Sequence, residues 1–445
     1  MKKNRKIHKP LNVYQITVLG FAGLILLGTF LLKLPISSAS GTETSLMDAL
    51  FTATTSVCVT GLVVQDTGTY WSTFGQAVIL LLIQVGGLGV ITVAASFALL
   101  SGRKIGLLQR GAMQETVAAP KMGGIVRLTL FLLKATFVIE FLGAAIMAPS
   151  FIRDFGVGKG IWMAIFTSIS AFCNAGIDLM GVVAPYSSLT HYANNITVNI
   201  TLMLLIILGG LGFLTWDDVR THGIHLKKYR MQSKVILVTS ALLILIPAVA
   251  FFFLEFSHMP LKQRILSSLF QAVTPRTAGM NTADITSMSE PGKLIMILLM
   301  LIGGSPGSTA GGMKTTTFAV LIACACAVFR KRDSAHFFGR RIAHDVVATA
   351  ATLAMLYAGI CIGGAMIISL HEGLPLLTCL FETASAIATV GLTLGITPEL
   401  GILSKTLLIV MMYLGRLGGL TLIFAALSGE KQQMGKLPMD RITVG

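Results

Sequence analysis

Thr389-Val390-Gly391-Leu392 closes a short apolar stretch in the last quarter of the chain, and three looser copies of it occur earlier. In each copy, polar, small or β-branched residues precede a glycine and an aliphatic residue follows it: Val59-Thr60-Gly61-Leu62, Asn174-Ala175-Gly176-Ile177 and Thr277-Ala278-Gly279-Met280. The four glycines stand 115, 103 and 112 residues apart in a chain of 445 residues. A period near a quarter of the length indicates fourfold internal repetition.

The chain is far more apolar than a soluble protein, with 54% hydrophobic and 12% charged residues, where soluble domains carry about 25% charged residues. Its net charge is +15, and 23 of its 34 basic residues fall in five clusters at the termini or between apolar spans: 2–9, 103–127, 220–234, 330–341 and 431–441. Such clusters mark cytoplasmic segments of membrane proteins, and their placement argues against a nucleic-acid partner. We therefore expect a multi-pass protein of the cytoplasmic membrane, surrounded by the lipid bilayer, with N- and C-termini both cytoplasmic.

The intervals between basic clusters are about 100 residues long, which suits two spanning helices of about 20 residues each with a middle portion to spare. Stretches of about 12 residues at 45–56, 261–272 and 374–386 precede the glycines and are too short to span. We predict an all-α membrane protein: four parallel helix–pore loop–helix (M1-P-M2) repeats around one central pore, with eight transmembrane helices and four re-entrant pore helices. The expected boundaries are 1–102, 103–220, 221–332 and 333–429, followed by a cytoplasmic tail at 430–445.

Glycines also recur in the second spanning segment of each expected repeat, where small residues let membrane helices approach closely. These runs are Gly86-Gly87-Leu88-Gly89, Gly209-Gly210-Leu211-Gly212, Gly303-Gly304-Ser305-Pro306-Gly307 and Gly415-Arg416-Leu417-Gly418-Gly419. One clear helix break stands out, in the third repeat, because proline and glycine interrupt helices; its residues are Gly303, Gly304, Ser305, Pro306, Gly307, Ser308, Thr309, Ala310, Gly311 and Gly312. We expect this segment to line the pore, the alternative being a simple kink between two helix halves.

The four glycine loops suit the coordination of a cation that has left water. Stacked backbone carbonyls can replace hydration oxygens, and glycine adopts the positive φ that inward-facing carbonyls often require. An acidic residue follows each loop, and at an outer mouth these acids would concentrate cations; the alternative for each is a solvated loop residue. The four acids are Asp66, Asp178, Asp284 and Glu399.

Several charges lie at membrane depth, where they usually face a cavity or a partner. Arg416 lies about fifteen residues into an apolar span, so we expect it to face a cavity or a partner. Arg276 is expected to brace the third loop from behind. No role follows from the sequence for Glu140, Glu255 or Glu382.

The four-repeat layout, the single glycine in each loop and Arg416 resemble the Trk/Ktr/HKT superfamily of K⁺ transporters, most closely the bacterial Ktr membrane subunit (KtrB), over nearly the whole chain. Because all four loops keep their glycine, the resemblance implies channel-like K⁺ uptake, with K⁺ at the filter carbonyls and Na⁺ left open as an activator. It also implies that residues 303–312 form an intramembrane gate near Arg416. At that place Arg416 either sets a barrier to conduction or ties down the carbonyls of the gate. The implied partners are a second copy in a homodimer and a cytosolic ring of KtrA-type proteins that bind ATP or ADP.

Other functions fit the sequence less well. Gly307 and Gly312 resemble a phosphate loop, but Met313 precedes Lys314 and no strand comes before, so we expect no nucleotide on this chain. No catalytic set of side chains indicates an enzyme. The alternative is a Na⁺- or H⁺-coupled secondary transporter, which would favour inverted repeats and several broken helices; here the repeats are parallel and one break is clear.

Overall fold

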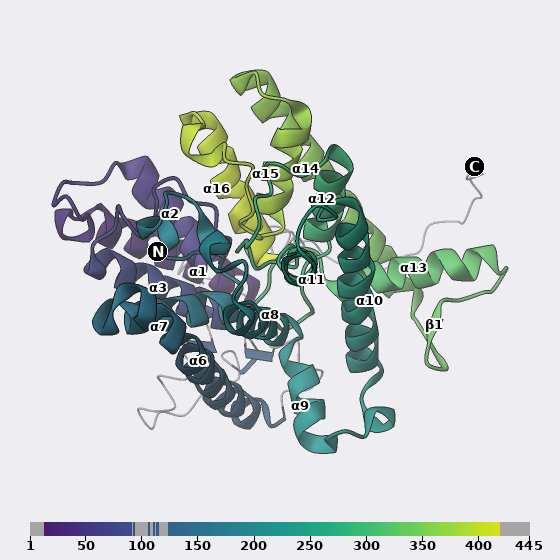
Figure 1. The fold of residues 1–445 in the computed structure, drawn as a ribbon. Helices are drawn as coiled ribbons and strands as arrows, with labels where there is room; N and C mark the ends of the chain where they lie inside the picture. The colour runs from purple at the N-terminus through teal and green to yellow at the C-terminus, as the bar shows by residue number, and fades with distance from the viewer. Residues whose placement is uncertain are drawn as a thin grey trace, which may run out of the picture.

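The computed structural model describes residues 13–90, 92–93, 106, 110–111, 113–114 and 123–418, and these residues are almost entirely helical (Figure 1). The expected tail at 430–445 and the expected boundaries at 102 and 429 lie outside the described residues. The predicted helical fold is confirmed, and the strands of the described residues form one short hairpin, in which β1 (His336–Phe337) pairs with β2 (Arg340–Arg341). Phe338 and Gly339 both have positive φ, the conformation of a two-residue turn that joins antiparallel strands.

Four helices in the described part of the chain are long and apolar enough to cross a membrane: α1 (Val13–Lys33), α6 (Ile125–Phe155), α10 (Met231–Leu254) and α14 (His344–Glu372). Each is the first helix of an expected repeat. Their surfaces expose large apolar side chains, such as Phe141 at 72% and Phe253 at 65%. A contiguous apolar exterior of this kind suits contact with lipid rather than with water.

A shorter helix follows each long one and ends just before a glycine loop: α2 (Leu46–Val57), α7 (Val157–Cys173), α11 (Leu261–Val273) and α15 (Leu376–Ile387). The predicted short helices at 45–56, 261–272 and 374–386 are confirmed to within two residues. Ser45 begins α2, because its hydroxyl accepts a hydrogen bond of 3.1 Å from the backbone N–H of Asp48. At 12 or 13 residues, three of these helices are shorter than a bilayer is thick.

The second helix of each expected repeat is also short: α3 (Thr73–Leu88), α8 (Ile196–Gly210), α12 (Glu290–Leu301) with α13 (Thr315–Phe329) beyond a break, and α16 (Ile402–Leu417). None of these helices is long and apolar enough to cross a membrane alone. Among them, α8 becomes long enough when it is taken together with α9 (Phe213–His222), which follows it. Four to five spans are therefore evident among the described residues, against the eight expected.

Our expectation of a single helix break is wrong. The axes of α8 and α9 differ by 98° across Gly212, and the expected boundary at 220 falls inside α9. Gly89 and Gly418 end α3 and α16, and Gly212 precedes α9. All three have nearly the same backbone, at φ of 87°, 82° and 86° and ψ of 128°, 133° and 139°. Only glycine adopts this region readily, so the sequence signal for these breaks was present in the glycine runs.

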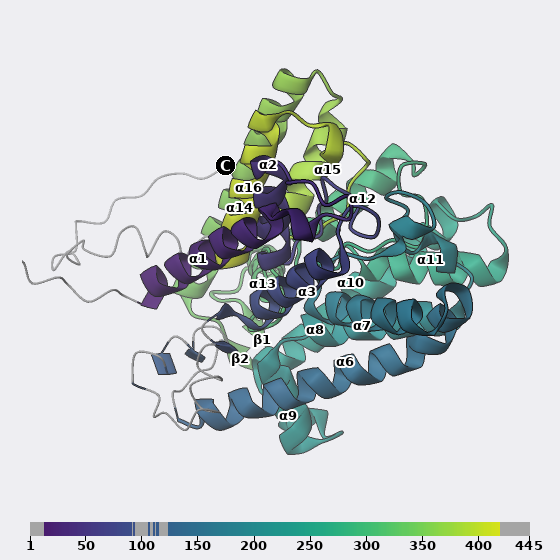
Figure 2. The same cartoon turned by 90° about the vertical axis from the view of Figure 1, so that its left-hand side faces the viewer.

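The repeats close into a ring. Each second helix contacts the short helix of the next repeat: α3 with α7, α8 with α11, α12 with α15, and α16 with α2. The last contact brings the two ends of the described chain together, and Figure 2 shows α16 beside α1 and α2. The Tyr413 hydroxyl of α16 donates a hydrogen bond of 2.6 Å to the carbonyl of Val18 in α1.

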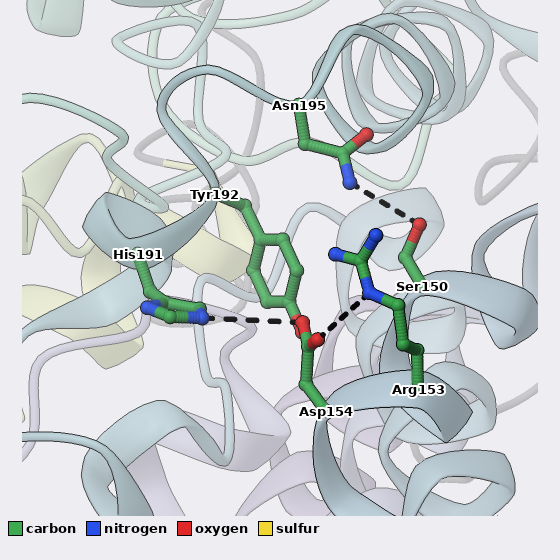
Figure 3. A network of polar contacts seen from close by, with 6 residues as sticks. All are labelled: Ser150, Arg153, Asp154, His191, Tyr192 and Asn195. Carbon is green, nitrogen blue, oxygen red and sulfur yellow. Dashed lines mark hydrogen bonds and ion pairs between the residues drawn. The ribbon is translucent and has the colours of Figure 1, made fainter.

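Polar side chains tie the ends of the long helices to the starts of the second helices. At the end of α6, Asp154 accepts a hydrogen bond of 2.9 Å from the Tyr192 hydroxyl, and Asn195, which caps α8, donates to Ser150 (Figure 3). Tyr192 belongs to the short 3-10 segment Ser188–Tyr192. Comparable ties join α10 to α12 through Glu255 and Ser289, and α14 to α16 through Glu372, Gly401 and Ser404.

Candidate functional site

The four loop glycines meet around one axis. A Cβ atom built on each glycine would lie against the carbonyl oxygen of the residue that precedes the next glycine, at 2.6 Å for Gly61 and Ala175, 2.8 Å for Gly176 and Ala278, 2.2 Å for Gly279 and Val390, and 2.2 Å for Gly391 and Thr60. The chain of contacts returns to its starting loop, so the glycines form a closed ring. Any side chain here would displace a neighbouring carbonyl.

The backbone conformation repeats from loop to loop. Each glycine has positive φ, and so does the residue two places before it, at 56° for Val59, 57° for Asn174, 72° for Thr277 and 53° for Thr389. The residue between them does not, and this alternation turns successive carbonyls to one side of the strand. Positive φ is a real outlier for β-branched residues, costing about 1–3 kcal/mol where surrounding structure enforces it. We anticipated it for the glycines only.

Hydrogen bonds from the short helices enforce this conformation. The N–H of the residue before the glycine donates to a carbonyl five positions back, at 2.8 Å for Thr60 to Thr55, Ala175 to Ser170 and Val390 to Ser385. In the first and fourth loops the glycine N–H also bonds the hydroxyl of Thr55 or Ser385, at 2.9 Å in each case.

The third loop departs from this pattern. Ala278 bonds Thr274, which is four positions back. The second loop, which its sequence marks as the least regular, keeps the common backbone bond instead. Pro275 lies in the third loop and lacks an N–H, which agrees with a local change of hydrogen bonding.

Each loop also buries side-chain oxygens that have no hydrogen-bond partner among the described residues. They are Thr60 Oγ1, Asn174 Oδ1, Thr277 Oγ1 and Thr389 Oγ1. Buried polar atoms of proteins are nearly always paired, and leaving one unpaired costs about 1–3 kcal/mol. One such oxygen in every loop indicates a function that needs unpaired electronegative atoms near the ring.

A cavity of about 400 Å³ opens on one side of the ring. The four glycines and all four acids, Asp66, Asp178, Asp284 and Glu399, line it. Asp284 and Glu399 are exposed.

The other two acids stabilise the loops of this mouth. Asp66 accepts a hydrogen bond of 2.8 Å from the N–H of Tyr186, and Asp178 accepts bonds from Met180 and Ser188. Burial raises the pKa of the Asp178 carboxyl to about 6, while these two hydrogen bonds lower it and the nearby Asp66 charge raises it.

The interrupted segment between α12 and α13 lies directly against the other side of the ring. A Cβ on Gly311 would lie 2.1 Å from Thr389 Oγ1, and one on Gly303 would lie 3.4 Å from the Thr277 methyl group. Asn174 Nδ2 donates a hydrogen bond of 3.3 Å to Thr309 Oγ1. The segment therefore contacts three of the four loops.

Neighbouring helices hold this segment by its backbone. Ser305 and Thr309 donate N–H bonds of 2.9 and 3.2 Å to the carbonyls of Gly210 and Gly209. The N–H of Phe213, the first residue of α9, donates a bond of 2.6 Å to the Gly307 carbonyl. The break that bends α8 away from α9 thus exposes the backbone groups that bind the segment.

Two basic side chains lie beneath the ring. The Arg416 guanidinium donates to the carbonyls of Thr309, Gly86 and Gly87, so it joins the segment to the end of α3. The Lys314 ammonium donates to the Ala310 carbonyl at 2.8 Å. Both line a cavity of about 260 Å³ together with Pro306, Gly307 and Ser308. Hydrogen bonds from Arg416 to carbonyls of the interrupted segment were one of two alternatives for this residue, and the bond to Thr309 is present. The position of Lys314 beneath the ring was not anticipated from the sequence.

The remaining charges at membrane depth have structural partners. Arg276 donates to Ser240 of α10 at 2.9 Å, behind the third loop. Glu140 accepts from Gln84 of α3 at 3.1 and 3.2 Å. Glu382, wholly buried in α15, accepts from the hydroxyls of Thr393 and Thr397, which follow the fourth loop. Thr393 and Thr397 lie 11 and 15 residues after Glu382, too far along the chain for the sequence to indicate these bonds.

Comparison with known proteins identifies the family. Residues 10–434 match the family model TrkH, described as a cation transport protein. The chain is 38% identical to the potassium/sodium uptake protein NtpJ of Enterococcus hirae, covering 100% of this chain and 99% of that protein. It is 37% identical to the Ktr system potassium uptake protein B of Bacillus subtilis, covering 94% of each.

A solved structure shows the same fold. The crystal structure of the potassium transporter TrkH from Vibrio parahaemolyticus superposes with a TM-score of 0.73 at 19% identity, over 95% of this chain and 86% of that one. With its apolar helices, the protein is a multi-pass membrane protein. The chain belongs to the TrkH family of cation transport proteins.

Proposed function

We propose that this protein takes up K⁺ through a pore whose selectivity filter is the ring of four glycine loops. The observation that carries the proposal is the closed ring, in which each glycine lies against the carbonyl that precedes the next glycine. Around it, four M1-P-M2 repeats with the boundaries 1–102, 103–220, 221–332 and 333–429 would supply eight transmembrane helices. In this proposal three of these spans include residues beyond the helix ends at Gly89, Leu211 and Gly418, so the described second helices α3, α8 and α16 are only parts of their spans.

The ring offers the ligands that a dehydrated alkali cation requires. Its carbonyls replace hydration oxygens, and the unpaired oxygens of Thr277 and Thr389 add further ligands at the Thr positions. The short helices α2, α7, α11 and α15 end at the loops, so their partial negative charges favour a cation there. In the cavity of about 400 Å³ on the opposite side of the ring from residues 303–312, exposed Asp284 and Glu399 raise the local cation concentration.

We assign K⁺ rather than Na⁺ as the main substrate because glycine occupies the ring position in all four loops. Relatives are named for potassium uptake, and one is named for potassium and sodium uptake. Na⁺ therefore enters as a candidate activator or second substrate. The chain itself binds no nucleotide in this proposal, because residues 303–312 are committed to contacts with the ring and with α8.

Residues 303–312 act as the gate. They lie against the ring, and Arg416 and Lys314 place two positive charges beneath it, in the path of a leaving cation. Conduction requires the segment and the Arg416 guanidinium to move aside together, because the Thr309 carbonyl joins them.

The gate requires control from outside this chain. Relatives belong by name to Ktr systems, which supports a cytosolic KtrA-type ring that binds ATP or ADP and acts on a homodimer of this subunit. In this arrangement the protein lies in the cytoplasmic membrane with both termini inside.

Flux into proteoliposomes tests the proposal. Uptake of Rb⁺ driven by membrane voltage alone, preferred over Na⁺ and saturating at one site, is the expected result, and Tl⁺ should give an anomalous scattering peak on the ring axis. Heavy-atom density elsewhere and none at the ring would overturn the assignment.

Coupled transport is the second candidate, since the bent α8–α9 pair shows that breaks are not confined to one repeat. Uptake that stops without a Na⁺ or H⁺ gradient, at constant voltage, would favour it.

A further inference from the structure

A third cavity, of about 420 Å³, lies beside the gate and plays no part in the proposed pathway. Its walls are the starts of α10 and α14, the first half of α13 and the β1–β2 hairpin. Figure 1 shows the hairpin below α13 and beside α10. Pro306 of the gate segment forms part of the wall. A molecule in this cavity would therefore touch both lipid-facing helices and the gate.

The cavity is apolar inside and basic at its mouth. Val235, Val320 and Leu353 are buried or half-buried lining residues, while Val346 is 45% exposed at the opening. Arg341 also lines the cavity, is exposed, and makes no ion pair among the described residues. The stretch 330–341 contains five basic residues and one acid, and Asp345 is the next acid along the chain.

We propose that this cavity binds an anionic phospholipid, with an acyl chain against Val235, Val320 and Leu353 and the phosphate at Arg341. The lining is mostly apolar; its polar members are Gln232, Thr316, Thr317, Thr349 and Arg341, of which Arg341 alone is charged. A small soluble anion would leave the apolar surface uncovered, and a neutral lipid would gain nothing from the unpaired arginine. Basic pockets between helices on the cytoplasmic side are suited to anionic headgroups. That the lipid lies in the cytoplasmic leaflet rests on the proposed function, because the proposed function supplies the orientation of the chain in the membrane. The binding site itself does not depend on the proposed function.

The bound lipid would steady the gate. Pro306 lies between Ser305, which bonds Gly210, and Gly307, which bonds Phe213. The first residue of α13, Thr315, donates an N–H bond of 3.0 Å to Gly304. A chain packed against Pro306 and α13 supports these bonds in the arrangement described here, so its loss raises cation flux.

Native mass spectrometry of the purified full-length protein with phosphatidylglycerol or phosphatidylcholine tests the site. We expect retained phosphatidylglycerol, lowered about fivefold by Arg341→Gln, which is the effect of one basic residue at an anionic surface. Arg340→Gln is the matched control, because Arg340 is exposed on the same strand but does not line the cavity. Val346→Trp should fill the opening and displace the lipid.

Three results would overturn the proposal: equal losses in Arg340→Gln and Arg341→Gln, full retention in Val346→Trp, or equal retention of phosphatidylcholine. Displacement by inorganic phosphate would show a free-anion site instead, and a change of oligomeric state in Val346→Trp without lipid loss would show a contact between copies. Bound lipid is read without any flux. A protein that binds phosphatidylglycerol but carries no K⁺ would refute the proposed function and leave this site standing.

Discussion

The four glycine loops, which we propose as the filter, and residues 303–312, which we propose as the gate, are both glycine-rich, non-helical stretches, but they are held in opposite ways. A filter loop bonds the short helix that immediately precedes it, as Thr60 bonds Thr55 and Val390 bonds Ser385. The gate segment bonds residues about a hundred positions away, such as Gly209 and Arg416. Local bonds form with the helix and stay with it, whereas bonds between repeats break when the repeats shift. Under the proposed function, we therefore expect a rigid filter above a movable gate.

The energies agree with this division. The filter tolerates positive φ at Val59, Thr277 and Thr389, at about 1–3 kcal/mol each, which requires tight local support. Each neutral hydrogen bond of the gate contributes only about 0.5–1.5 kcal/mol, and the Arg416 bonds contribute roughly twice as much. A small set of such bonds can be released by a partner or by voltage.

The largest expected effect is on the filter. Gly279→Ala would place a Cβ 2.2 Å from the Val390 carbonyl oxygen, where Gly176→Ala leaves 2.8 Å to Ala278. Both positions have positive φ, so both variants are strained, but the first displaces a ring carbonyl further. We expect K⁺ flux in proteoliposomes to fall about 100-fold in Gly279→Ala and about tenfold in Gly176→Ala, equivalent to about 2.7 and 1.4 kcal/mol.

Size-exclusion profiles and thermal stability of both variants control for misfolding. In a rigid filter the loss of flux should follow the size of the clash. Equal losses in Gly176→Ala and Gly279→Ala would therefore contradict a filter that is more rigid than the gate.

The next effect concerns the strongest tie of the gate. Arg416→Gln removes the charge that joins Thr309 to the carbonyls of Gly86 and Gly87. It also removes one positive charge from the exit path. We expect Rb⁺ flux measured without any cytosolic partner to rise about tenfold, the effect of about 1.4 kcal/mol. Lys405→Gln is the control, because Lys405 is a basic residue of the same helix whose ammonium donates to the Pro398 carbonyl, on the opposite side of the ring from the segment 303–312. A rise of equal size in both variants would remove Arg416 from the gate.

A smaller effect should follow from a neutral tie. Thr309→Val removes the hydroxyl that bonds Phe172 and Asn174 but keeps the backbone bonds of residue 309. Losing about 1 kcal/mol should raise flux about fivefold. Ser308→Ala removes a hydroxyl that bonds Ser305 within the segment, and it should leave flux nearly unchanged. A larger rise of flux in Ser308→Ala than in Thr309→Val would show that the gate is stabilised by hydrogen bonds within its own segment, as a filter loop is by the helix before it.

The sequence predicts local features of this site well and distant ones poorly. The glycine period and the short apolar stretches located α2, α11 and α15 to within two residues, because each signal lies in adjacent residues. The positive φ of Thr277 and Thr389 has no such signal, since β-branched residues normally avoid it. It follows from the packing of four loops around one axis.

Distant partners account for the other differences. Glu382 reaches Thr393 and Thr397 across a filter loop, and Glu140 reaches Gln84 in another repeat. The helix ends at Gly89 and Gly418 were not anticipated, because the glycine runs that contain them are equally explained by close packing of membrane helices. Gly86 and Gly415 serve such packing, because a Cβ on them would lie 2.1 and 2.0 Å from the carbonyl oxygens of Val57 and Ile387.

The smallest expected effect is at the mouth above the filter. The pKa of Asp178 is about 6, so acidifying that side from pH 7.5 to 5.5 neutralises one of four acids lining the cavity. We expect Rb⁺ uptake at subsaturating concentration to fall about twofold with a midpoint near pH 6, because fewer cations collect at the mouth. The ratio of Rb⁺ to Na⁺ flux should not change if the filter is rigid. Asp178→Asn should abolish the step near pH 6.

Unfolding cannot produce the same curve through this residue. The folded-state pKa of Asp178 lies above its ordinary value of 3.8 because of burial, so the folded protein binds the proton more tightly than the unfolded chain does. Its contribution to stability is therefore fully present below pH 4 and is lost as pH rises through 6. Acid thus lowers flux while Asp178 favours the folded state, and a loss of flux that tracks a falling melting temperature would contradict the proposed role.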